Sequence, residues 1–216
     1  MSKLYFRYGA MNCGKSTSLL QVAHNYEERG MKVVLLKPSV DTKADVKISS
    51  RIGAEREVDH LVLPNEKLYF YLTELPKKNL SCVLVDEAQF LSESQVEELS
   101  VFTKFLKIPV ICFGLRTDFR SVLFEGSKRL FELADELEEL YTICRCGKKA
   151  RFNGRMKDGK FITEGEQISI DDGKNYESLC GECYLRKVKK MKGWYWHEIC
   201  LFVFWRKQRY EKFTWW

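Results

Sequence analysis

The sequence predicts an α/β fold in which a parallel sheet is flanked by helices and followed by a small β-rich segment. Three observations predict it. Apolar runs of four or five residues, typical of strands buried on both faces, alternate with longer helical patterns. A glycine-rich loop joins the first apolar run to the first helical pattern. Two closely spaced cysteine pairs stand among glycines later in the chain and mark the β-rich segment.

The first part of the fold occupies residues 1–140. Strands are predicted at residues 4–6, 33–36, 82–85 and 110–113, and helices at about 15–28, 94–106 and 125–139. Because buried parallel strands are joined by helical crossovers, this alternation indicates a doubly wound sheet with helices on both faces. Gly30 fits a helix end, and all four prolines fall at the ends of predicted elements.

Length and cysteine content limit the possibilities further. A chain of 216 residues can hold one sizeable core with a small satellite, but not two full catalytic domains. The first ten residues contain no long apolar stretch, so we expect no signal peptide and a cytosolic location. In that compartment, the eight cysteines are expected to be reduced, buried or metal-bound and not paired in disulfides.

The glycine-rich loop matches the phosphate-binding pattern G-x-x-x-x-G-K-[ST] without a mismatch, and it follows a strand and opens a helix as that pattern requires. Such a loop points successive backbone N–H groups at phosphates, and the helix N-terminus adds partial positive charge. Lys15 is expected to reach the β- and γ-phosphates, and Ser16 to supply an oxygen to Mg²⁺. The residues of the loop are Gly9, Ala10, Met11, Asn12, Cys13, Gly14, Lys15 and Ser16.

Two carboxylates follow the apolar strand at residues 82–85. Asp86 is the candidate for holding Mg²⁺ and its ligand shell, as expected at the end of a strand next to a phosphate-binding loop. Glu87, one residue further, can accept a proton from the attacking nucleophile. Helicase-type ATPases carry a similar string in which the glutamate activates water. The two motifs therefore predict ATP, Mg²⁺ and phosphoryl chemistry, but leave the acceptor open.

The two cysteine pairs predict a zinc site. Cys144 and Cys146 are separated from Cys180 and Cys183 by 33 residues, a separation resembling that of zinc ribbons. Four thiolates can hold one tetrahedral Zn²⁺ and fasten a segment that has too little apolar material to fold alone. Because all four positions are filled by protein, the metal is expected to be structural. We assign this segment to residues 141–183.

With these residues in hand, the chain resembles the zinc-containing thymidine kinases of the cytosolic and bacterial type. The likeness runs from about residue 4 to residue 184 and covers the phosphate-binding loop, the strand and turn at 83–90, the segment 113–120, both cysteine pairs and Tyr176. The resemblance implies a RecA-like α/β domain and a zinc-held lasso that closes over the nucleoside. It also implies a homotetramer.

The resemblance further implies a role for particular residues. Glu87 is implied to be the base that deprotonates the 5′-hydroxyl of thymidine, and Asp86, Glu87, Ala88 and Gln89 to lie at the ATP site beside the loop. The residues implied to contact the nucleoside are Met11, Asp41, Phe90, Leu115, Phe119, Phe124, Ile170 and Tyr176. The chain departs from the common family residues at Lys43, Asp171 and Asp172. Arg51 and Arg120 are candidates for transition-state countercharge, with an exposed surface position as the alternative.

The basic charge of the chain has a local origin. Residues 184–216 carry nine Lys and Arg against two Glu, a net of +7, while the whole chain is +6, so residues 1–183 are close to neutral. The longest apolar run in this aromatic and basic tail is too short to span a membrane, and the role of the tail is unassigned.

Two functions therefore stand. The first is a kinase that uses ATP-Mg as phosphoryl donor and structural Zn to make dTMP from thymidine for nucleoside salvage, with deoxyuridine as a further substrate. It predicts a nucleoside substrate and no nucleic acid. The alternative is a nucleic-acid-dependent P-loop ATPase with a zinc module. Length favours the kinase, because about 75 residues after the first domain cannot form the second lobe that a helicase needs.

Overall fold

The computed structural model describes residues 2–39, 46–75, 80–167 and 175–192. Its centre is a six-stranded sheet in the order β5-β2-β6-β7-β1-β8, and every neighbouring pair is parallel. The strands are β1 (Leu4–Gly9), β2 (Lys32–Pro38), β5 (His60–Val62), β6 (Leu80–Val85), β7 (Val110–Leu115) and β8 (Glu136–Glu139). The prediction of a parallel α/β sheet is confirmed.

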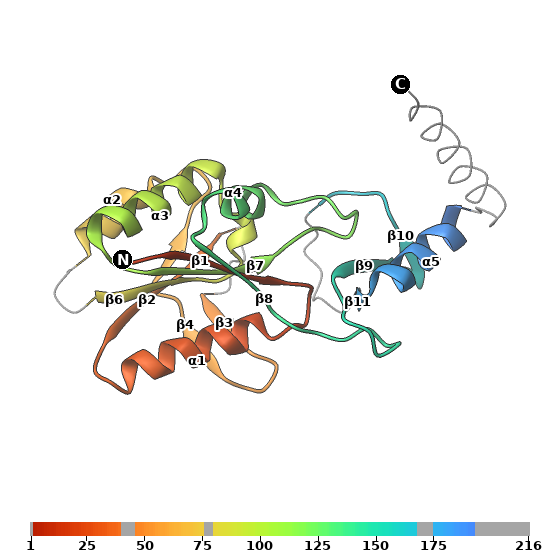
Figure 1. Ribbon diagram of the computed structural model, residues 1–216, viewed down its shortest axis with the longest axis horizontal. Coiled ribbons are helices and arrows are strands. Elements are labelled where there is room, and N and C mark those ends of the chain that lie inside the picture. Colours follow the sequence, from red (N-terminus) through yellow and green to blue (C-terminus); the bar gives the residue numbers. More distant parts are fainter. Residues whose placement is uncertain (1, 40–45, 76–79, 168–174, 193–216) are drawn as a thin grey trace, which may run out of the picture.

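Helices cover both faces of this sheet (Figure 1). One face carries α1 (Lys15–Glu27) and the hairpin of β3 (Lys47–Ser49) and β4 (Glu55–Glu57). The other carries α2 (Leu68–Glu74), α3 (Glu93–Leu106) and α4 (Glu125–Leu133). The short 3₁₀ helix η1 (Ala88–Phe90) follows β6 and packs beside α4.

Alternation within the strands builds a core on each face. In β6, Val83 and Val85 join the cluster under α2–α4, while Cys82 and Leu84 join the cluster under α1. Both sets are fully buried, which explains why the sequence shows a continuous apolar run instead of a polar and apolar alternation. Helix α3 begins one residue before the predicted start, because Ser92 and Gln95 form a capping box.

The predicted helix at residues 125–139 is wrong in its second half. Helix α4 ends at Leu133, and residues 136–139 form the edge strand β8, paired in parallel with β1. The backbone N–H of Asp135 donates to the carbonyl of Leu4 (2.8 Å), and that of Leu140 donates to the carbonyl of Tyr8 (2.7 Å). These bonds satisfy the open edge of β1, and they override the helix-favouring glutamates of the segment.

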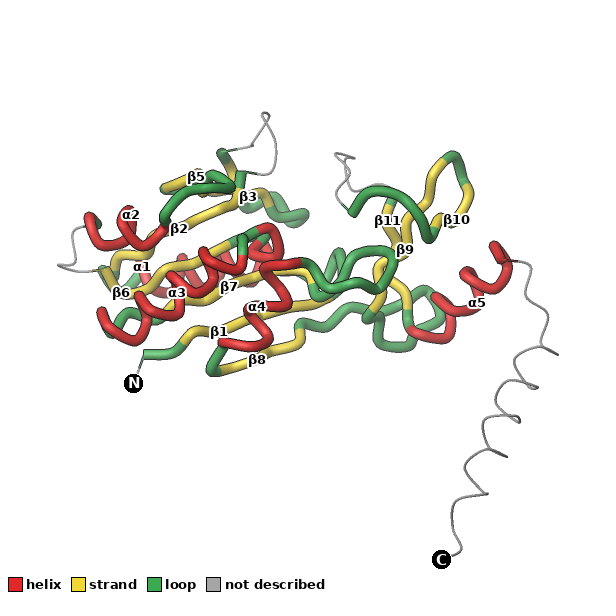
Figure 2. Tube along the Cα trace, turned by 90° about the horizontal axis from the view of Figure 1, so that it is seen from above, coloured by secondary structure: helices red, strands yellow, loops and turns green. Residues whose placement is uncertain are grey.

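The second part of the structure lies beyond the carboxyl ends of the strands (Figures 1 and 2). It contains the antiparallel sheet β10-β9-β11 and the helix α5 (Gly181–Lys192). Strand β9 spans Phe152–Lys157, β10 spans Lys160–Ile162 and β11 spans Tyr176–Leu179. A small apolar cluster around Leu179 and Tyr184 lies between this sheet and α5, so the segment has a small hydrophobic core. Helix α5 crosses the expected boundary at residue 183.

Candidate active site

The phosphate-binding loop joins the end of β1 to the start of α1. Asn12 and Gly14 have left-handed backbone angles, with φ of 62° and 79°. Gly9 is required for a different reason, since a Cβ there would stand 2.5 Å from the sulfur of Cys13 and 3.0 Å from the carbonyl of Leu140. These turns carry the chain from the strand into the helix over a very short path, as the pattern predicts.

Lys15 is held at the inner side of the loop. Its side chain is buried, and its Nζ lies 3.3 Å from the carbonyl oxygen of Ala10 and 4.0 Å from the sulfur of Cys13. The loop opens on a cavity of about 380 Å³. The residues that line it are Met11, Asn12, Gly14, Lys15, Ser16, Thr17, Ser49, Ser50, Arg51, Ile52, Glu87 and Leu115. The ammonium group and the Glu87 carboxylate therefore border the same space.

Asp86 is 3% exposed, and its Oδ1 has no hydrogen-bond partner among the residues described. Burial, and next the nearby charge of Glu87, raise the pKa of this carboxyl to about 7. An unpartnered carboxylate oxygen beside a phosphate-binding loop fits a hard cation such as Mg²⁺, which prefers oxygen ligands. The site thus accommodates the metal that the sequence implies.

Glu87 is half-buried and has an unusual backbone, with φ of 49° at the entry to η1. Gln89 holds its side chain: Nε2 of Gln89 donates to Oε2 of Glu87, while Oε1 of Gln89 accepts from the backbone N–H of Leu115 at 2.9 Å. Because Gln89 is 1% exposed, it acts as a fixed bridge between the carboxylate and β7. Ala88 is buried beneath the same turn.

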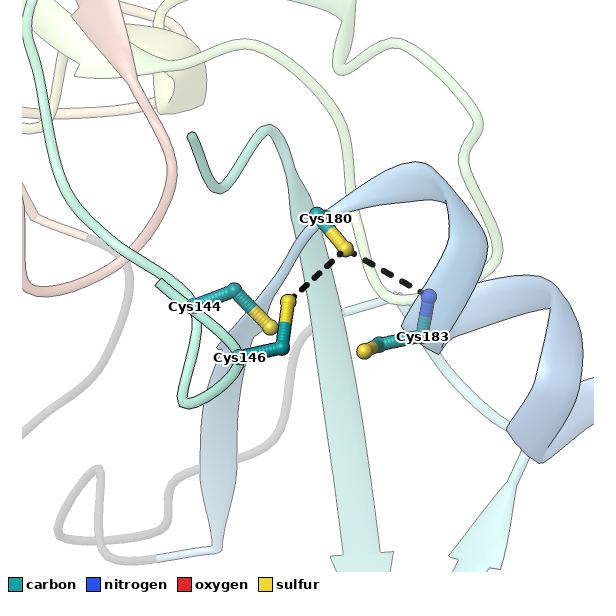
Figure 3. A group of neighbouring side chains, drawn as sticks. All are labelled: Cys144, Cys146, Cys180 and Cys183. Atoms are coloured by element: carbon teal, nitrogen blue, oxygen red, sulfur yellow. Dashed lines mark hydrogen bonds between the residues drawn. The ribbon is translucent and has the colours of Figure 1, made fainter. Parts of the chain in front are cut away.

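The four cysteines come together from both ends of the second part (Figure 3). Their sulfurs all lie within 4.8 Å of one another. A Zn–S distance of about 2.3 Å in a tetrahedron gives S···S distances of about 3.8 Å, so the cluster has the size of a zinc site. Cys144 and Cys146 face the same point because Gly147, at φ of 82°, closes a turn in which its N–H donates to the carbonyl of Cys144.

The Cys144 thiol is suited to bind a metal. Burial opposes its ionisation, but backbone hydrogen bonds from Cys146 and Cys180, together with its thiol neighbours, lower its pKa to about 7. The four residues, with their sulfurs within 4.8 Å of one another, could hold zinc.

Known proteins match the chain over this whole arrangement. The sequence model of the family described as "Thymidine kinase" matches residues 2–184. The chain belongs to the thymidine kinase family. Proteins described as thymidine kinase are 47% identical over 193 residues in Enterobacteria phage T4, 50% identical over 190 residues in Haemophilus influenzae and 46% identical over 190 residues in Pasteurella multocida. These alignments cover 87–88% of this chain and 98–100% of the relatives.

Family membership makes the chain a kinase phosphotransferase, and it implies ATP as donor and a nucleoside as substrate. The cysteine cluster agrees with the zinc-containing type of the family. The match ends at residue 184, so most of the basic tail lies outside it. Along the described part of the chain, none of the helices combines the length and the apolar character needed to cross a membrane.

The residues expected at the nucleoside fall into separate groups. Met11 and Leu115 line the cavity beside Glu87. Phe90 and Phe124 meet edge to face, with ring centroids 5.6 Å apart, and line a second cavity of about 390 Å³. Gln89, expected at the ATP site, lines this second cavity and not the first.

Two further expected residues lie under one guanidinium. Phe119 is fully buried and Tyr176 is half-buried, and the guanidinium of Arg155 lies over both rings, 5.3 and 5.7 Å from their centroids. Asp41, Lys43, Ile170, Asp171 and Asp172 fall outside the described residues.

The two candidate arginines differ in position. Arg51 lines the cavity with Lys15 and Glu87, whereas Arg120 is paired with the buried carboxylate of Asp118 at 2.8 Å. The sequence did not predict the other cavity residues of the β3–β4 hairpin, Ser49, Ser50 and Ile52, because a short polar turn carries no pattern that indicates where it will pack. A larger cavity of about 800 Å³ lies at the amino ends of β1 and β7, remote from this chemistry.

Proposed function

We propose that the protein transfers the γ-phosphoryl group of ATP to the 5′-hydroxyl of thymidine, giving dTMP for nucleoside salvage, with deoxyuridine as a further substrate. The observation that carries the proposal is the shared cavity, in which the Lys15 ammonium and the Glu87 carboxylate border one space at the mouth of the phosphate-binding loop. Phosphoryl transfer requires mainly alignment and countercharge, and a cation and a carboxylate on one cavity support this proposal.

Each side chain then has a distinct task. The backbone N–H groups of the loop and Lys15 bind the phosphates and offset the charge that spreads over the transferred group. Ser16 and Asp86 would hold Mg²⁺, which neutralises phosphate charge when bound. Glu87 accepts the proton of the 5′-hydroxyl, since an alcohol at neutral pH needs a positioned base to become a nucleophile. Gln89 keeps the Glu87 carboxylate turned toward the cavity.

The nucleoside would lie between the two cavities. Met11 and Leu115 border the phosphate side, while Phe90 and Phe124 supply flat apolar surface on the other side of Gln89. Apolar walls around a pyrimidine with a methyl group favour thymine, and the loss of one methyl group costs only about 10- to 200-fold in discrimination. This range is the reason for including deoxyuridine among the substrates.

The test compares Glu87→Gln with Glu57→Gln, an exposed glutamate on the β3–β4 hairpin whose loss leaves the cavity unchanged. Removal of a general base typically costs about 10² to 10⁴ in rate, so Glu87→Gln should lose transfer to thymidine while ATP affinity stays within a few fold. Glu57→Gln should behave like the wild type.

Two results would defeat the proposal. The first is near-normal thymidine phosphorylation by Glu87→Gln, which would remove the base. The second is a wild-type ATP turnover that ignores thymidine but rises with single-stranded DNA, which would establish the nucleic-acid-dependent ATPase instead.

A further inference from the structure

One buried side chain of the zinc-holding segment reaches out to the phosphate-binding loop. Asn153, on β9, is 2% exposed. Its Oδ1 accepts a hydrogen bond from the backbone N–H of Met11 at 2.8 Å, and its Nδ2 donates to the backbone carbonyl of Thr117 at 2.8 Å. The orientation of the amide is unambiguous, because a backbone N–H can only donate and a carbonyl can only accept.

The neighbouring strand holds the same residue, Met11, through its carbonyl group, which belongs to the next peptide. Ser178 on β11 is the cross-strand partner of Asn153, and its hydroxyl donates to the carbonyl oxygen of Met11. The next carbonyl, that of Asn12, accepts from the hydroxyl of Thr142 at 3.3 Å. Three side chains from residues 142–178 therefore bind the backbone of Met11 and Asn12.

This part of the loop needs such support. Asn12 lies in the left-handed region at φ of 62°, a conformation that asparagine tolerates but that residues in an extended or helical backbone do not share. It also lies exposed, so packing does not hold it in place. The direction of the following N–H groups, which a phosphate would meet, depends on this turn keeping its shape.

The contacts to the loop are tied closely to the cysteine cluster. Thr142 precedes Cys144 by two residues, and Ser178 precedes Cys180 by two. Both side-chain hydrogen bonds of Asn153 leave the segment for the α/β domain. Its amide thus contributes to the joint between the two parts and not to the interior of either.

We infer that Asn153 is a positioning residue for ATP: it fixes the backbone N–H of Met11 relative to the carbonyl of Thr117, two residues past β7, so that the zinc-held segment shapes the phosphate-binding loop. The inference rests on the proposed function only in taking ATP as the ligand of that loop. The segment then has a part in binding the donor as well as in covering the nucleoside.

The experiment compares Asn153→Ala with Asn175→Ala, which removes an exposed asparagine from the same segment. For each we would measure zinc per chain, the Kd of ATP·Mg, the KM and kcat for thymidine, and hydrogen exchange of the peptide covering residues 9–16. One lost hydrogen bond changes an equilibrium by about 2- to 12-fold, so we expect Asn153→Ala, which loses the bond to the loop, to weaken ATP binding by about that factor. It should keep its zinc and show faster exchange in the loop, while Asn175→Ala matches the wild type.

Two more variants keep the test decisive if Asn153→Ala folds poorly. Asn153→Asp retains an acceptor for the N–H of Met11 but cannot donate to Thr117, and Ser178→Ala removes the bond to the carbonyl of Met11. Each of these variants should weaken ATP binding less than Asn153→Ala does. Because both side chains act on the backbone of one residue, Met11, the double variant Asn153→Ala with Ser178→Ala should show non-additive effects on ATP affinity.

Three results would overturn the inference. They are wild-type ATP affinity in Asn153→Ala, unchanged exchange in residues 9–16, and a loss of ATP binding that only accompanies a loss of zinc. Failure of the proposed function would look different, because the wild-type protein would then fail to phosphorylate thymidine, while the exchange measurement would still report on the loop.

Discussion

A single methyl group at Gly126 should displace the turn that carries Glu87. Gly126 lies in the first turn of α4 and packs against the backbone of η1 and its flanks. A Cβ at this position would stand 2.5 Å from the carbonyl oxygen of Ala88, 2.6 Å from that of Leu91 and 3.0 Å from that of Gln89. All three contacts are backbone atoms, so no side chain can swing aside to make room.

The size of the effect follows from two opposing contributions. Alanine in place of glycine within a helix ordinarily stabilises a protein by about 1 kcal/mol. A carbon normally approaches a carbonyl oxygen to about 3.3 Å, so α4 or the turn must shift by about 0.8 Å. Overpacking of this kind costs about 1–3 kcal/mol, and rigid backbone neighbours favour the upper end. We expect Gly126→Ala to lower the free energy of unfolding by about 2 kcal/mol, or the Tm by about 4–8 °C.

The assay is thermal and urea unfolding of zinc-loaded protein, together with kcat for thymidine. Gly181→Ala is the matched control, because it is also a helical glycine but its Cβ would meet only the edge of the Phe152 ring, at 3.3 Å. We expect Gly181→Ala to stay within about 1 kcal/mol of the wild type, and kcat to fall in Gly126→Ala as Glu87 moves with its turn. A Gly126→Ala protein that is more stable than the wild type, with normal kcat, would refute the reasoning.

Two other predictions concern charge and metal. The pKa of Asp86 is about 7 in the folded protein and about 4 in an unfolded chain, so the folded state holds an extra proton between these pH values. Without nucleotide or magnesium, the free energy of unfolding should therefore fall as the pH rises from 4 to 7, by up to about 4 kcal/mol. Asp86→Asn should flatten this dependence in urea titrations at pH 5 and 8 and lose magnesium-dependent ATP binding; an unchanged slope would contradict the assignment. Cys146→Ser should lower the zinc content below one per chain, measured by elemental analysis, and should weaken ATP binding in parallel. Cys112→Ala, which removes a buried thiol of β7, should keep its zinc. Full zinc content in Cys146→Ser would exclude the four-cysteine site.

Local patterns explain why much of the site could be predicted. The glycines and Lys15 work through backbone turns that span only eight residues, so their spacing alone defines the loop. Asp86 follows a buried strand, and strand ends in a parallel sheet gather at one edge. The cysteine pairs carry their own geometry, since Gly147 closes the C-x-C turn and the other pair lies where α5 begins.

Other features could not be read from local patterns. The composition of residues 136–139 favours a helix, but they form a strand because β1 offers an unpaired edge. Arg51 and Arg120 look alike in sequence, yet one borders the cavity and the other pairs with Asp118. For residues 136–139 and for Arg51 the deciding neighbours lie on other elements, outside the reach of periodicity or propensity. The partner of Arg120 is only two residues away, but the burial of Asp118 comes from the fold.

By itself, the sequence indicated a parallel α/β sheet, the phosphate-binding loop, the two carboxylates and the two cysteine pairs, because the apolar runs, the loop and each pair are patterns within short stretches of the chain. Only the tertiary structure decided how these pieces support one another. Gln89 joins Glu87 to β7, Gly126 allows α4 to approach the turn that carries Glu87, and Asn153 reaches Met11 across 142 positions of the chain. Hydrogen bonds and close contacts of this kind require the whole chain to fold before the partners meet.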